Sequence, residues 1–94
     1  MHPFTQAYVT GVRECSGVYW LMDSRQQTIY IGQSTTSVRA RLQSHLSGYE
    51  GSGTQQASYF QYEVNSNAQQ RERELLAAYR QATGRLPRYN EVMP

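Results

Sequence analysis

The sequence contains no lysine: all nine of its basic residues are arginines. This absence excludes a lysine Schiff base, a phosphate-loop lysine and a lysine general base. Arginine presents a planar fork of donors that binds a phosphate through two parallel hydrogen bonds, which suits nucleic acid. A bias in genomic base composition explains the arginines at least as well, and the net charge of +2 is small. Composition alone therefore identifies no partner.

Cysteine and long apolar runs are also scarce. The single cysteine, Cys15, excludes an intramolecular disulfide and fits a reducing compartment such as the cytoplasm. One cysteine and two histidines exclude a four-thiolate zinc site or a zinc knuckle. No stretch is long enough to span a bilayer, and the first residues lack the basic and apolar regions of a signal peptide. We therefore expect a cytoplasmic protein that does not bind a membrane.

The length of 94 residues suits one domain, so we expect residues 1–94 to form a single unit. Hydrophobic periodicity and turn residues predict strands at 17–22, 28–32 and 57–64 and helices at about 38–47 and 67–82. The short link between the first two strands predicts an antiparallel hairpin. Residues 1–16 form an N-terminal arm or contain an extra strand at 6–10, and residues 87–90 are expected to be extended. This order of elements predicts an α/β fold with helices packed on a small sheet.

The first predicted helix places two polar residues beside its apolar side. Val38, Leu42 and Leu46 recur at four-residue spacing and form the side that packs on the sheet. Arg41 and His45 lie next to this stripe, from where a long side chain reaches the rim of the sheet. An arginine extended over the margin of the core and a hydrogen-bonded histidine explain both positions without any function, and geometry alone favours that interpretation.

The second predicted helix carries two glutamates with different surroundings. At about 100° per residue, Glu72 lies on the side of Leu75 and Leu76, whereas Glu74 points to water. A carboxylate on a packed side is costly unless it is paired or coordinates a cation. Glu72 is therefore either half of an ion pair at the edge of the core or a metal ligand, and the helix alone does not decide between them.

The predicted hairpin carries two short motifs, Gly17-Val18-Tyr19 and Tyr30-Ile31-Gly32, separated by ten residues. Behind them follow, in order, the helix with Arg41 and His45, then Glu72-Arg73-Glu74-Leu75-Leu76, then Pro87-Arg88-Tyr89-Asn90. From Gly17 to Asn90 these segments resemble the GIY-YIG endonucleases. That family includes phage homing endonucleases, the nuclease domain of bacterial excision repair, some restriction enzymes and structure-specific resolvases.

The resemblance implies a three-stranded antiparallel sheet flanked by helices and one divalent metal, Mg²⁺ or Mn²⁺, held by a single glutamate. Carried over position by position, it implies a catalytic set of Tyr19, Tyr30, Arg41, His45 and Glu72, with Glu72 as the metal ligand. We place three further residues at the substrate-binding surface, namely Gly32, Arg39 and Asn90. The asparagine is also expected to brace the wall of the site. Two alternatives stay open, Arg39 in place of Arg41 and Glu74 in place of Glu72.

The activity implied by the resemblance is hydrolysis of a phosphodiester bond by an activated water, in DNA repair or recombination, with RNA as the other substrate. Arg41 would neutralise charge that develops on the phosphate. Tyr19 is the candidate general base if nearby cations lower its pKa, and His45 is the competing base. The alternatives are a nucleic-acid-binding module without activity and a protein-interaction surface. No targeting domain is visible, so specificity would come from DNA structure, a partner or a homodimer.

Overall fold

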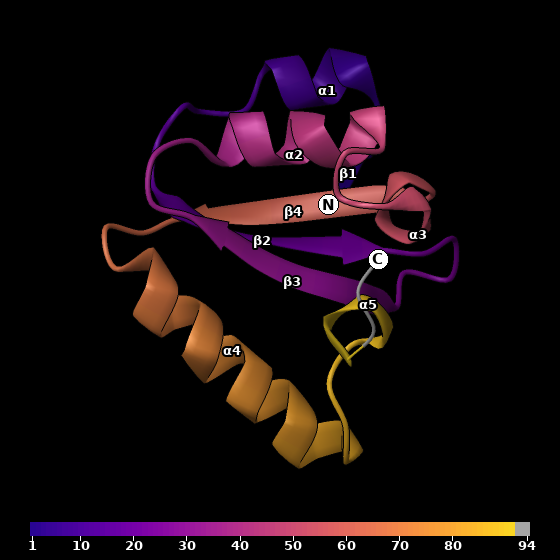
Figure 1. Cartoon of the computed structure of the whole chain (residues 1–94), viewed down its shortest axis with the longest axis vertical. Helices are drawn as coiled ribbons and strands as arrows, with labels where there is room; N and C mark the ends of the chain where they lie inside the picture. The colour runs from indigo at the N-terminus through magenta and orange to yellow at the C-terminus, as the bar shows by residue number, and fades with distance from the viewer. Residues whose placement is uncertain (92–94) are drawn as a thin grey trace.

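The computed structural model describes residues 1–91. The strands are β1 (His2–Pro3), β2 (Gly17–Met22), β3 (Thr28–Ser34) and β4 (Tyr59–Val64). The helices are α1 (Gln6–Thr10), α2 (Val38–Ser47), α3 (Ser52–Gln55), α4 (Ala68–Thr83) and α5 (Arg88–Glu91). Figure 1 shows α1 and α2 on one side of the sheet and α4 on the other, which confirms the predicted α/β class with flanking helices.

The sheet has four antiparallel strands in the order β1-β4-β2-β3. The prediction of three strands was one short, because β1 adds two residues that pair with β4. A strand of two residues is too short to produce a visible alternation in the sequence. The alternative of an extra strand at 6–10 was wrong. That segment forms α1, with Thr5 as its N-cap and Val9 fully buried.

The central strand β2 is buried along nearly its whole length, as its apolar sequence predicts. It pairs with β3 on one side and β4 on the other. A side chain at Gly17 would overlap the carbonyl oxygen of Glu63 on β4. Glycine at this position therefore allows the two strands to approach closely enough to pair.

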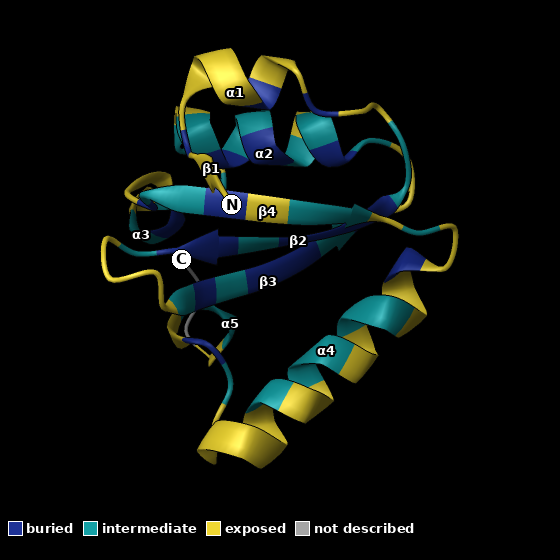
Figure 2. Ribbon diagram, turned by 180° about the vertical axis from the view of Figure 1, so that it is seen from behind, coloured by how far each residue is buried: buried dark blue, intermediate teal, exposed yellow. Residues whose placement is uncertain are grey.

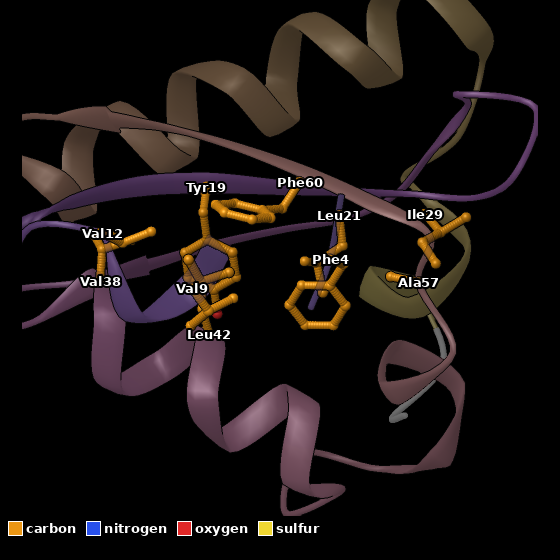
Figure 3. Close-up of a cluster of buried hydrophobic side chains, with 10 residues drawn as sticks. All are labelled: Phe4, Val9, Val12, Tyr19, Leu21, Ile29, Val38, Leu42, Ala57 and Phe60. Atoms are coloured by element: carbon orange, nitrogen blue, oxygen red, sulfur yellow. The ribbon is translucent and has the colours of Figure 1, made fainter. Parts of the chain in front are cut away.

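The hydrophobic core lies between the sheet and the pair α1 and α2. Figure 3 shows its ten buried members, which come from the N-terminal segment, the sheet, α2 and the link between α3 and β4: Phe4, Val9, Val12, Tyr19, Leu21, Ile29, Val38, Leu42, Ala57 and Phe60. The ring of Tyr19 extends from the sheet toward the helix that carries Val38 and Leu42. Its polar hydroxyl is thus placed inside an apolar core and needs a hydrogen-bond partner there.

The two long helices begin and end close to the predicted residues. Helix α2 follows Ser37, whose hydroxyl accepts a hydrogen bond from the Ala40 amide (3.1 Å), and ends at Gly48 in the left-handed conformation (φ 87°). Helix α4 ends at Gly84 (φ 85°) in the same way. Its N-cap is Asn67, the residue at which the helix was predicted to begin. The Asn67 side chain donates to Gln70 instead of capping the helix.

Two segments predicted without helix contain a short one. The loop 48–56 includes α3, and the segment 87–90, predicted to be extended, folds into α5. The Asn90 amide donates to the Pro87 carbonyl oxygen at 2.9 Å, which closes the turn. The fixed φ of proline suits the start of a helix as well as an extended chain, so the proline did not distinguish the two.

Within residues 1–91, no helix combines the length and the apolar character needed to cross a membrane.

Candidate active site

A chain of hydrogen bonds runs from the sheet through α2 to α3. The Tyr19 hydroxyl and His45 Nε2 are 2.8 Å apart, and His45 Nδ1 lies 2.8 Å from the Thr54 hydroxyl. All three side chains are fully buried. The structure therefore brings Tyr19 and His45 together. It also places His45, rather than Leu46, on the buried side of α2, because Leu46 is only partly buried.

Gly32 makes room for the tyrosines of the two strands. It lies opposite Tyr19 in the β2–β3 register. A side chain at this position would overlap the phenol end of Tyr19 and come within 2.8 Å of the Tyr30 ring. The two rings, with centroids 6.2 Å apart, thus converge above the glycine. Gly32 was predicted to lie at the substrate. The structure supports a more specific role, because the absence of a side chain leaves room for the two tyrosine rings.

Arg41 lies one turn before His45 and borders both tyrosines. Its Nη1 donates to the carbonyl oxygen of Gln33 on β3 at 3.2 Å, and its Nε lies 3.3 Å from a carboxylate oxygen of Glu50. The second contact has the distance of an ion pair but lacks hydrogen-bond geometry. Among residues 1–91, the buried Nε of Arg41 has no hydrogen-bond partner. A buried N–H without an acceptor is costly, so this position favours an incoming anion.

Glu72 extends from the packed side of α4, as the helical rotation predicts. Glu72, Leu75, Leu76 and Tyr79 are half-buried, whereas Glu74 is exposed; Figure 2 shows this division along the helix. Burial raises the pKa of Glu72, and the charges of Arg41 and Arg73 act in the opposite direction. Within the described part of the chain, its carboxylate takes part in no ion pair. Of the two glutamates on α4, Glu72 is therefore the one that lies near Arg41.

Burial raises the pKa of both tyrosines. For Tyr19, the loss of hydration outweighs the charge of Arg41, which alone would lower the pKa. The same two causes act on Tyr30, and burial again dominates. Arg41 thus acts in the expected direction on the Tyr19 pKa, but burial outweighs its charge in the protein by itself. A free phenolate at Tyr19 is disfavoured near neutral pH.

His45 is neutral at physiological pH for the same reason. Burial, reinforced by the nearby charge of Arg41, lowers its pKa to about 4. A neutral imidazole has one N–H that donates and one nitrogen that accepts. The hydroxyls of Tyr19 and Thr54 satisfy both nitrogens, so the ring is held in place from both ends.

Two predicted substrate-binding residues, Arg39 and Asn90, form hydrogen bonds to other parts of the chain. Arg39 donates to the Val12 carbonyl oxygen (2.7 Å) and pairs with Glu14 (3.2 Å), which ties α2 to the N-terminal segment. Asn90 both accepts from the Ile31 amide and donates to the Ile31 carbonyl oxygen, each at 2.9 Å. It thereby caps the edge strand β3. The hydrogen bonds of Asn90 support its expected role in bracing the wall of the site. Arg39 is held by the N-terminal segment, so Arg41 is the arginine of the site.

Two residues of the site were missed from the sequence. Thr54 and Glu50 both lie in the segment rich in glycine, serine and glutamine that follows α2. Periodicity carries no information in such a segment, and both contacts depend on how the loop folds back on the helix. The isolated acidic residue in an otherwise uncharged loop was the one visible signal for Glu50.

The family follows from the sequence comparison. Residues 15–86 match the GIY-YIG catalytic domain. The chain belongs to the GIY-YIG family. A search of curated proteins found no match to this chain. Membership in the GIY-YIG family implies endonuclease activity, that is, hydrolysis within a nucleic-acid strand. The match covers the tyrosines, Gly32, Arg41, His45 and Glu72 of the site just described.

GIY-YIG nucleases generally use a divalent metal ion. Within residues 1–91, no three His, Cys, Asp or Glu side chains form a cluster that would enclose a metal. The site instead offers one half-buried carboxylate, Glu72, without an ion-pair partner in that range. One carboxylate suits Mg²⁺, which keeps several waters and takes few protein ligands. The residues present therefore fit a singly anchored hydrated cation.

Proposed function

We propose that the protein is an Mg²⁺-dependent endonuclease that hydrolyses phosphodiester bonds in DNA. The observation that carries this proposal is that the site holds one cationic and one anionic group whose interactions are both incomplete. Arg41 has a buried N–H that lacks a hydrogen-bond acceptor, and Glu72 has a half-buried carboxylate that lacks an ion-pair partner, both within residues 1–91. A phosphate satisfies the first and a cation satisfies the second. Glu72 would hold the metal, which when bound supplies charge that stabilises the leaving oxygen.

Arg41 binds the scissile phosphate in this proposal. In the free protein its guanidinium is held by the Gln33 carbonyl oxygen and the Glu50 carboxylate. A phosphate oxygen offers the hydrogen-bond geometry that Glu50 does not, so the substrate displaces Glu50. The guanidinium then faces the charge that develops on phosphorus during attack.

Tyr19 and His45 act together as the base. With Thr54 accepting from His45 Nδ1–H, the Nε2 atom accepts the Tyr19 proton. Tyr19 takes a proton from the attacking water as it gives its own to His45, so no free phenolate forms. Binding of a phosphate to Arg41 weakens one of the two causes that lower the His45 pKa. This proposal therefore combines the two candidate bases, Tyr19 and His45, in one proton relay.

The test is a plasmid assay. Purified protein is expected to nick supercoiled plasmid in Mg²⁺ and to be inactive in EDTA. One active site cuts one strand, so linear product should appear after nicked product unless two copies act together. The alternative, a binding module without activity, predicts retarded plasmid in a gel without any nicked product. A protein-interaction surface predicts neither result at low salt.

A further inference from the structure

Tyr49 is an exposed aromatic residue next to the active site. Its side chain is 89 % exposed, more than that of any other large hydrophobic residue in the described range. Its backbone is nevertheless fixed. The Tyr49 amide donates to the Ser44 carbonyl oxygen at 3.0 Å, and the Gly51 amide donates to the Gly48 carbonyl oxygen at 3.1 Å. An ordered turn thus holds this exposed residue out into solvent.

The ring borders an open cavity that is shared with the active site. Tyr30, Tyr49, Glu50 and Asn90 line this cavity of about 420 Å³, together with Tyr89 and the glycines of the turn. The Tyr30 ring also lies beside His45, tilted by 60° with centroids 5.1 Å apart, and Glu50 contacts Arg41. A phosphate on Arg41 would therefore place the adjoining nucleotide over this cavity. Volumes of this size are typical of small-ligand sites.

Tyr89, another lining residue of the cavity, is also held in position. A side chain at Gly53 on α3 would overlap the Tyr89 ring, so the ring packs directly against the helix backbone. The Arg88 guanidinium lies 5.9 Å from the centre of the same ring. Three tyrosines, Tyr30, Tyr49 and Tyr89, therefore line the cavity, and aromatic rings of this kind stack with flat, polarisable groups.

We propose that Tyr49 stacks on an unpaired base adjoining the scissile phosphate and selects DNA with single-stranded or branched character. This inference rests on the proposed function for the position of the phosphate. A nucleobase is the flat group that a nucleic acid brings next to a bound phosphate. In a continuous duplex both faces of each base are covered by its neighbours, whereas a flap or loop leaves one face free. One projecting ring beside the site therefore favours the unpaired form.

The direct test places the fluorescent base analogue 2-aminopurine at each unpaired position next to the junction of a flap DNA, in EDTA so that nothing is cut. Stacking quenches this fluorophore. Wild type and Tyr49→Phe are expected to quench it at one position, and Tyr49→Ala to lose the quenching. Tyr8→Ala is the matched control, since Tyr8 is 53 % exposed on α1 and outside the site. Quenching that survives in Tyr49→Ala overturns the inference.

Cleavage gives a second readout. Base stacking on an aromatic ring is worth about 1–3 kcal/mol, so Tyr49→Ala should raise KM for flap DNA roughly 5- to 150-fold and leave kcat within about twofold. An equal loss on flap and duplex DNA contradicts the selective role, as does a change in oligomeric state in place of a change in KM. If the wild type cuts no DNA but the quenching depends on Tyr49, the proposed activity fails and the stacking stands.

Discussion

Two arginine–glutamate regions on this small protein differ in how completely their hydrogen bonds are made. On the α4 side, Arg71 contacts Glu63 through two hydrogen bonds, at 2.8 and 3.1 Å. These bonds, with one from Asn65, lower the pKa of Glu63. In the active site, the Arg41 Nε has no hydrogen-bond partner and burial raises the pKa of Glu72, in the same described range. In the first region the charged groups satisfy each other without a ligand, whereas in the second the Arg41 Nε has no hydrogen-bond partner within residues 1–91.

This contrast shows that an arginine–glutamate ion pair is not by itself evidence of a functional site. Arg71 and Glu63 satisfy each other at the surface, where an ion pair contributes little to stability. Arg41 and Glu72 lie on different elements, one on α2 and the other on α4, and form no ion pair with each other within residues 1–91. Within residues 1–91, the Arg41 Nε has no hydrogen-bond acceptor and the Glu72 carboxylate has no ion-pair partner, so each of these two groups can bind a ligand that the chain does not supply. Incomplete satisfaction of buried polar groups is typical of functional sites.

The largest expected effect is the difference in plasmid nicking between substitutions of Arg41 and Arg71. Arg41→Ala should lower plasmid nicking about 100-fold or more, because it removes a preorganised donor to the phosphate. Arg71→Ala is the matched control and should nick like the wild type, with at most a small decrease in Tm because its ion pair lies at the surface. Initial rates of nicking and far-UV circular dichroism provide the two readouts. Equal losses for both variants would mean that the comparison between the regions is unfounded.

The next effect concerns stability and pH. His45 has a folded pKa of about 4 against its ordinary value of 6.5. Above pH 6.5 it is neutral in both states, and below that value the unfolded chain takes up the proton first. Stability should therefore fall between pH 6.5 and 4 by about 3 kcal/mol, since one pKa unit corresponds to roughly 1.4 kcal/mol.

Thermal melts of His45→Gln provide the comparison for this pH effect. Glutamine keeps a donor and an acceptor for the Tyr19 and Thr54 hydroxyls but does not titrate. The difference in Tm between wild type and variant should shrink as the pH falls from 7 to 4. A constant difference over this range would show that His45 titrates near its ordinary value in the folded protein.

The smallest effect concerns Glu50. Glu50→Gln removes the charge that competes with the phosphate for Arg41, so KM for DNA should fall roughly two- to fivefold. Both side chains are about one-third exposed, which limits the gain. Steady-state kinetics at low salt measure the change, with Glu14→Gln as a control on the Arg39 pair. A rise in KM or a lower kcat would assign Glu50 a positive part in the reaction.

Local patterns in the sequence were sufficient to predict most of the fold. Strand β2 follows from its apolar, β-rich run and helix α2 from four-residue spacing, and the rotation of α4 distinguished Glu72 from Glu74. These features depend on neighbours in the chain. The two-residue strand β1 and the five-residue helix α1 were not predicted, because such short elements depend on tertiary contacts more than on periodicity.

The site was predicted less completely, for a related physical reason. The pKa of Tyr19 rises because the core encloses it, and the amount of enclosure is not visible in the tripeptide that carries it. Thr54 and Glu50 reach the site only because the turn after α2 folds back on the helix. Residue types in a motif indicated the chemistry, whereas long-range packing determined the electrostatics.

The most direct test of the account compares Glu72→Ala with Glu74→Ala in the plasmid assay with Mg²⁺. The two residues are two positions apart on α4, and one is half-buried near Arg41 whereas the other is exposed. We expect Glu72→Ala to show no nicking above the EDTA background and Glu74→Ala to nick like the wild type, with both variants folded. Nicking by Glu72→Ala, together with its loss in Glu74→Ala, would contradict the assignment of the metal ligand and the contrast on which it rests.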